Sequence, residues 1–129
     1  MRLSVVVPTL NAREQLASTL DAIADVAPDA QLVVVNGPSA DGTTGMVRDH
    51  GAADVLLELS ERNLNAARNA GINEASGDLV AFVSQDTQLE DTWPDAVERA
   101  IENGADVVTG PVHRRVNGGV FLGLNGAVV

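Results

Sequence analysis

The chain has 129 residues, 45% of them hydrophobic, and a formal net charge of −10. This length fits a single domain that can bury a core of its own, and the acidity argues against unaided binding to nucleic acid, whose phosphates the chain would repel. The absence of cysteine excludes disulfides and thiolate metal sites, and no apolar run approaches the roughly 18 residues of a membrane span.

Two further features bear on where the protein works. The chain does not open on a signal-peptide pattern, because the apolar run at residues 3–7 is short and ends at a proline. We therefore expect a cytoplasmic protein. The chain has no lysine, and this together with its acidity favours a halophile-like protein, since salt screens the repulsion between carboxylates. An ordinary acidic protein from a GC-rich genome is the alternative.

Apolar runs and helical periodicities alternate along the chain. Continuous apolar runs such as residues 3–7 are typical of strands buried on both faces of a parallel sheet. Leu16, Leu20 and Ile23 recur at helical spacing, with Asn11 as a candidate cap. In chain order we predict strand 3–7, helix 13–26, strand 31–35, helix 43–50, strand 54–59, helix 65–75 stopped by Gly77, strand 79–84, a helix from Asp91 or Thr92 to Gly104, strand 106–109, and a glycine-rich strand or loop over residues 118–126.

This alternation predicts an α/β fold with a mainly parallel sheet and helices on both faces. We treat residues 1–129 as one domain. Three of the strands end in polar loops, at residues 8–11, 36–43 and 84–87. Because ligands bind at the carboxyl ends of strands in open α/β sheets, we expect these loops to share a site.

Asp86 is the strongest single candidate in these loops. An acid at a strand end with no lysine nearby suits a divalent cation that carries phosphate oxygens. Taken alone, the loops at residues 8–11 and 36–43 are better explained as strand ends, turns and helix caps, with Asp41 capping the helix that follows it, and a turn or cap is the alternative for Asp86. The common order on successive strands favours a nucleotide site.

Several enzyme classes lack their motifs here. The chain has no G-x-x-x-x-G-K-[ST], no G-x-G-x-x-G after the first strand, no G-x-S-x-G and no H-E-x-x-H. These absences disfavour a P-loop nucleotide hydrolase, a dinucleotide-binding fold, a serine hydrolase and a zinc protease. His50 and His113 are isolated in the sequence, and we expect them to be surface groups.

The order of the motifs resembles the family 2 glycosyltransferases of the GT-A fold. LSVVVPTLN at residues 3–11 is similar to the family's V-S-V-V-I-P-T-Y-N, and VNGPSADGT at residues 35–43 to V-D-G-G-S-T-D-G-T. ARNAGINEASGD at residues 67–78 is similar to A-R-N-x-G-I-x-x-A-x-G-D. SQD at residues 84–86, followed by Trp93, takes the place of the family's D-x-D and its Trp-led helix.

The resemblance implies an inverting transfer of sugar from a nucleotide-sugar donor to a carbohydrate or lipid-linked acceptor. It also implies Mg²⁺ or Mn²⁺ as cofactor, held by Asp86. Ser84 stands where the family usually has the acid that helps to hold the ribose, and Asn36 and Gly37 stand where an acid often reads the base. The nucleotide-sugar-binding residues implied by the resemblance are Pro8, Thr9, Asn11, Asn36, Arg68, Ser84 and Asp86.

The family's acceptor-side half, which carries the general base, has no counterpart in residues 1–129, so we expect a partial GT-A domain and assign no catalytic base. A homodimer is expected if apolar surface is left exposed where that half would pack. The alternative from another class is a non-catalytic nucleotide-sugar-binding or interaction module that keeps the fold. A sugar-nucleotide nucleotidyltransferase is disfavoured, because the first loop lacks the glycine-rich, basic character that grips a triphosphate.

Overall fold

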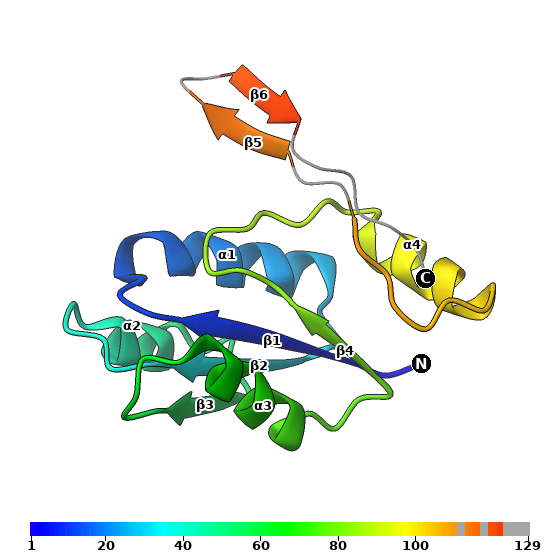
Figure 1. Ribbon diagram of the computed structural model, residues 1–129. Coiled ribbons are helices and arrows are strands. Elements are labelled where there is room, and N and C mark those ends of the chain that lie inside the picture. Colours follow the sequence, from blue (N-terminus) through cyan, green and yellow to red (C-terminus); the bar gives the residue numbers. More distant parts are fainter. Residues whose placement is uncertain (111–112, 117–118, 123–129) are drawn as a thin grey trace. The chain divides into compact units, whose positions relative to one another are not determined.

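The computed structural model describes residues 1–110, 113–116 and 119–122. The chain divides into two compact units, residues 1–91 and 92–129, which are considered separately. Figure 1 shows the elements in chain order. They are β1 Leu3–Thr9, α1 Arg13–Val26, β2 Gln31–Asn36, α2 Thr43–His50, β3 Val55–Glu58, α3 Leu64–Glu74, β4 Leu79–Phe82, α4 Trp93–Glu102, β5 His113–Val116 and β6 Gly119–Leu122.

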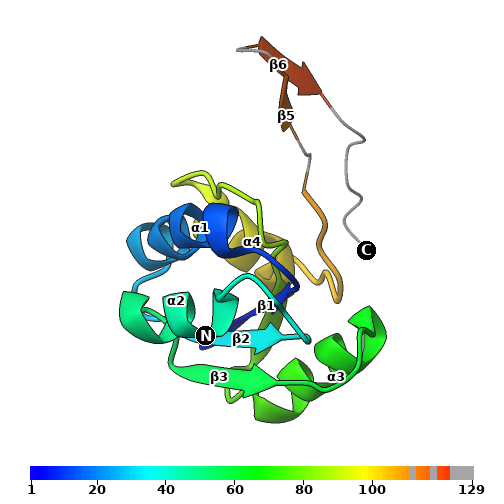
Figure 2. The same ribbon diagram turned by 90° about the vertical axis from the view of Figure 1, so that its left-hand side faces the viewer.

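The first unit is a four-stranded parallel sheet in the order β3-β2-β1-β4. Successive side chains of β1 point to opposite faces of the sheet, as they do in any strand. Val5 and Val7 pack with apolar residues of α1 and α2, whereas Val6 packs with Ala67 of α3. Figures 1 and 2 show α1 and α2 over one face and α3 over the other. The predicted α/β fold is confirmed.

Two glycines of the 67–78 motif allow close packing. A Cβ at Gly71 would collide with Val6 Cγ1, so α3 can approach β1 only with glycine at this position. A Cβ at Gly77 would lie 2.7 Å from Ser4 N and 2.8 Å from Arg2 O. Gly77 therefore lets the chain pass beside the start of β1. It is not the residue that stops α3, as the sequence suggested, since the helix ends at Glu74 and its cap residue, Ala75, is already in extended backbone.

The second unit departs further from the predictions. The expected strand at residues 106–109 is wrong, because only Val108 forms an isolated bridge. Val107 is 55% exposed, so burial does not hold this short apolar pair in a strand. β5 and β6 form an antiparallel hairpin in which His113 is opposite Leu122. Residue 118 and residues 123–126 of the predicted glycine-rich segment lie outside the described residues.

Candidate nucleotide site

The strand order creates a crevice at the carboxyl ends of the sheet. β1 connects to β2 on one side and pairs with β4 on the other, so β1 and β4 flank the point at which the strand order reverses. A pocket of about 200 Å³ lies over these strand ends. Its lining comes from the end of β1, the loops after all four strands and the start of α3: Pro8, Thr9, Leu10, Gly37, Leu59, Glu61, Arg62, Asn63, Leu64, Ala67 and Gln85.

The loops after β1 and β4 are joined directly. Leu10 N donates to Gln85 Oε1 at 3.0 Å, which places the turn that contains Asp86 beside residues 8–11. The shared edge expected from the sequence is therefore observed. Two of the predicted contact residues, Pro8 and Thr9, line the pocket itself.

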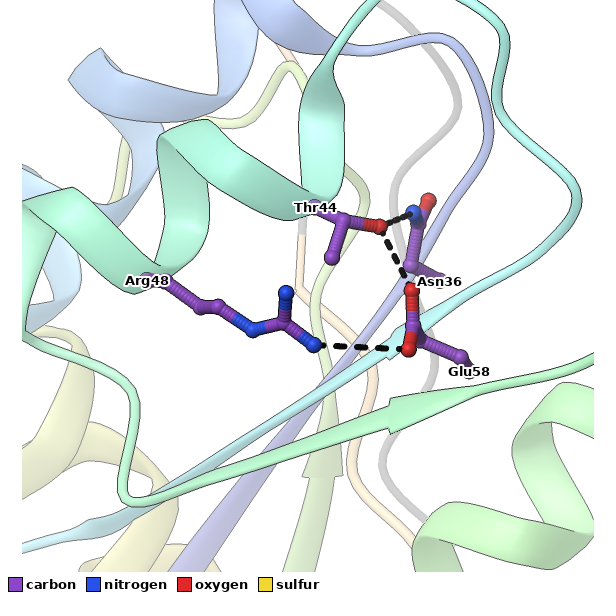
Figure 3. A network of polar contacts seen from close by, with 4 residues as sticks. All are labelled: Asn36, Thr44, Arg48 and Glu58. Atoms are coloured by element: carbon purple, nitrogen blue, oxygen red, sulfur yellow. Dashed lines mark hydrogen bonds and ion pairs between the residues drawn. The ribbon is translucent and has the colours of Figure 1, made fainter.

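Asn36 is held in a network rather than in the pocket. Its side chain is only 1% exposed, and its Oδ1 accepts hydrogen bonds from Thr9 Oγ1 (2.9 Å) and Ser39 Oγ (2.7 Å). Figure 3 shows the other side of the amide, where Nδ2 donates to Thr44 Oγ1 at 2.9 Å and Thr44 in turn donates to Glu58. The geometry gives Asn36 a structural role, and its contact with a base stays a prediction.

Glu58 closes this network at the surface. Its second carboxylate oxygen lies 3.5 Å from Arg48 Nη2 (Figure 3), with both side chains more than half exposed. An ion pair of this kind contributes about 0–1 kcal/mol. The pair ties α2 to the end of β3 but adds little to stability by itself.

Asn11 and Asp41 connect the loops after β1 and β2. Asn11 Oδ1 accepts from Ala40 N, and Asp41 Oδ2 accepts from Arg13 N in the first turn of α1. Asn11 is therefore not the cap of α1, as its sequence position suggested; it takes a positive φ of 48° and the cap position is Ala12. Asp41 also accepts from the backbone N–H of Thr43, the first residue of α2, but the cap position of α2 is Gly42, so Asp41 is not the helix cap that its sequence position suggested.

The charge of Asp41 is stabilised by these bonds. The Thr43 hydroxyl holds the pKa of Asp41 below its ordinary value of 3.8 against the opposing effect of desolvation, and the backbone N–H groups of Arg13 and Thr43 lower this pKa further. Because its carboxylate already accepts the α1 amide, Asp41 is a scaffold residue of the site.

The turn after β4 presents Ser84 and Asp86 at the surface. Thr87 N donates to Ser84 O at 3.2 Å, which closes a turn with Gln85 and Asp86 at its centre. Both Ser84 and Asp86 are exposed, and neither lines the pocket. Gln85 does line it.

Arg68 also lies outside the pocket lining. It is an exposed residue of α3 with no polar partner among the described residues. A different arginine, Arg62 in the loop between β3 and α3, lines the pocket beside Glu61 and Asn63. The sequence does indicate this loop, because residues 60–63 are a fourth polar segment that directly follows a predicted strand. The sequence prediction included only the polar loops at residues 8–11, 36–43 and 84–87.

The donor set for a metal ion is sparse. Among residues 1–110 no three His, Asp or Glu side chains gather closely enough to hold a metal. Asp86 offers one exposed carboxylate, and carboxylate oxygens suit Mg²⁺ and Mn²⁺. This residue therefore fits a metal whose other ligands are nucleotide phosphates and water.

No helix in the described part of the chain has the length and apolarity to cross a bilayer.

Solved structures with the same architecture include nucleotide complexes. The mannosyltransferase PcManGT from Pyrobaculum calidifontis, solved with GDP-Man and Mn²⁺, is 28% identical with a TM-score of 0.69, over 85% of this chain and 34% of that one. Staphylococcus aureus TarS 1–349 in complex with UDP is 27% identical, also with a TM-score of 0.69, over 82% of this chain and 34% of that one. Both likenesses cover only part of the solved chains.

Curated relatives show the same partial coverage. The dolichol-phosphate mannosyltransferase of Pyrococcus furiosus is 33% identical over 92% of this chain and 35% of its own length. The glycosyltransferase AglE of Haloferax volcanii is 31% identical over 84% of this chain and 38% of its own length. The chain thus spans little more than a third of these two relatives. The family model for glycosyl transferase family 2 matches residues 4–126, and the chain belongs to this family.

Proposed function

We propose that the described part of this chain binds the nucleotide of a nucleotide-sugar donor for an inverting glycosyltransferase. The observation that carries the proposal is the pocket of about 200 Å³ over the carboxyl ends of all four strands, bordered by the turn that presents Asp86. Its size and mixed lining fit part of a nucleotide, and nucleotides bind at this edge in open α/β sheets.

The pocket-lining residues and Asp86 have different roles in this proposal. Pro8, Thr9 and Gly37 line the pocket, and a flat base or ribose would lie against them. Arg62, in the loop just before α3, offers a positive charge to phosphate oxygens. Asp86 would hold Mg²⁺ or Mn²⁺ against the diphosphate, and the metal would supply charge neutralisation as the diphosphate leaves. No described residue is assigned as the base that deprotonates the acceptor hydroxyl.

The names of the relatives leave the nucleotide open between uridine and guanosine diphosphates, since one similar structure holds UDP and another GDP-Man. The acceptor that we propose is a carbohydrate or a lipid-linked molecule. A second function, a binding module without catalysis, is favoured by the sparse donor set: Ser84 stands where the family usually has an acid, and among residues 1–110 no three His, Asp or Glu side chains could hold a metal together.

The test is calorimetric titration of the chain with UDP and GDP, in EDTA and in Mn²⁺. We expect binding that strengthens with Mn²⁺, and Asp86→Ala should remove this strengthening while the circular dichroism spectrum and the unfolding midpoint stay unchanged, because an exposed turn carboxylate contributes little to stability. Asp29→Ala is the matched control, an exposed acid in the turn before β2 at the other end of the strands. An Asp86→Ala protein with the full Mn²⁺ effect would refute the assignment.

A further inference from the structure

Gln85 has its side-chain amide fixed in one orientation. Leu10 N carries a hydrogen and can only donate, so the Gln85 atom that faces it at 3.0 Å must be the oxygen, Oε1. The amide nitrogen, Nε2, therefore occupies the other branch of the side chain. This follows from the chemistry of the backbone donor and needs no choice between the two flipped forms.

The nitrogen of this amide is left with its hydrogens unpaired. Nε2 carries two N–H donors and has no hydrogen-bond partner within the described residues, although Gln85 is half-buried and lines the pocket. Nε2 is not fully buried, since His50 Nδ1 is the one buried side-chain N or O atom without a partner in the described part of the chain, so this donor is open to water or to a ligand in the pocket. The acceptors that suit it are neutral or anionic oxygens, and a metal cation is excluded as its direct partner because an N–H group cannot ligate one.

The backbone of Gln85 is held as firmly as its side chain. Gln85 O accepts from Thr19 Oγ1 at 2.7 Å, and Thr19 on α1 is only 1% exposed. One residue earlier, Ser84 O accepts from Thr87 N and closes the turn. A donor held at both ends loses little conformational freedom when it binds, which strengthens its contribution to affinity.

We propose that Gln85 contacts the nucleotide through Nε2, donating to an oxygen of the ribose–diphosphate part, while its Oε1 holds the loop after β1 in place. This inference rests on the proposed function. It commits to the ribose–diphosphate part because Gln85 directly precedes Asp86, the residue that faces the diphosphate in that proposal.

Two substitutions separate the contact from the positioning role. Gln85→Glu keeps an oxygen for Leu10 N–H but loses the donor, whereas Gln85→Met loses both. The matched controls are Gln88→Glu and Gln88→Met: Gln88 is in the same segment and bonds to Ser18 Oγ at 2.6 Å, but it does not line the pocket. Gln88→Glu introduces the same charge and so measures its general effect.

The measurement is the dissociation constant of UDP and GDP in EDTA, where a new glutamate cannot act as a metal ligand. We expect Gln85→Glu and Gln85→Met to weaken binding of the nucleotide that the wild type prefers by about 10-fold, the effect of one lost hydrogen bond. Both Gln88 variants should stay within about 2-fold of wild type. The ¹⁵N-resolved side-chain amide signal that disappears in Gln85→Met should shift when the nucleotide is added to the wild type.

Wild-type affinity in Gln85→Glu, or an amide signal that does not move on saturation, would overturn the proposal and leave Gln85 with a positioning role alone. Equal losses in Gln85→Glu and Gln88→Glu would overturn it as well, since charge would then explain the effect. If the wild type binds neither UDP nor GDP, the proposed function itself fails, an outcome distinct from wild-type binding that Gln85 substitutions leave unchanged.

Discussion

Replacing Asn36 with alanine tests whether this residue belongs to the scaffold or to the ligand site. Asn36 is 1% exposed, and its side chain takes part in three hydrogen bonds, with Thr9, Ser39 and Thr44. A net contribution of about 1 kcal/mol for each bond predicts that Asn36→Ala lowers the free energy of unfolding by about 3 kcal/mol. That is a large share of the 5–15 kcal/mol typical of a domain.

The assay is urea unfolding followed by circular dichroism at 222 nm. Asn73→Ala is the control, because Asn73 is an exposed residue of α3 without a polar partner among the described residues, and its replacement should change the free energy of unfolding by less than about 0.5 kcal/mol. Nucleotide affinity is measured in parallel at a temperature at which both variants are folded.

The reasoning is refuted if Asn36→Ala loses less than about 1 kcal/mol of stability. Such a result, combined with a large fall in nucleotide affinity, would mean that the amide serves the ligand and not the network. A large loss of stability with little change in affinity of the folded fraction would agree with the structure.

Two other predictions follow from local geometry. Gly77→Ala should lower the free energy of unfolding by about 1–3 kcal/mol, because its Cβ would meet backbone atoms 2.7 and 2.8 Å away that cannot turn aside as a side chain can; Gly45→Ala, where a Cβ meets nothing within 4 Å, is the control, and equal stability of the two variants would contradict the packing argument. The pKa of Asp41 is lowered chiefly by the Thr43 hydroxyl, so its ionised form stabilises the fold above pH 3.8, and this stabilisation is lost as the pH falls through the folded pKa. The stability difference between wild type and Asp41→Asn should therefore shrink below pH 3.8, and a difference that grows there would show that the sign is wrong.

The first unit was predictable because its signals are local and strong. The apolar runs of β1 and β2 are buried on both faces, and such runs have few other stable arrangements. The predicted bounds of α1 and α2 match the structure residue for residue. The strand predicted at residues 106–109 failed because two adjacent valines give an apolar signal without the cover that would bury them.

The site was predictable in its place but not in its contacts. Sequence order indicates which loops meet at the carboxyl edge, because parallel strands bring their ends together. It does not indicate which polar groups bond to one another there. Asn11 and Asn36 lie in the expected loops, yet both amides are used within the scaffold, whereas the pocket-lining Arg62 and Gln85 were not singled out.

The hydrogen bonds within the scaffold limit which side chains are free to contact a nucleotide. The polar side chains at the ends of β1 and β2 and in the loops that follow form hydrogen bonds between the two segments, through Asn11, Asn36 and Asp41. In the binding that we propose, these loops would contribute backbone atoms and a rigid surface rather than free polar side chains. Among the described residues, the polar side chains of the lining that have no partner belong to the loop after β3, at Glu61 and Arg62, and Gln85 adds the free half of its amide from the turn after β4. Discrimination between nucleotides within this part of the chain should accordingly change with substitutions in these two segments, even though the motifs that identify the family lie mainly elsewhere.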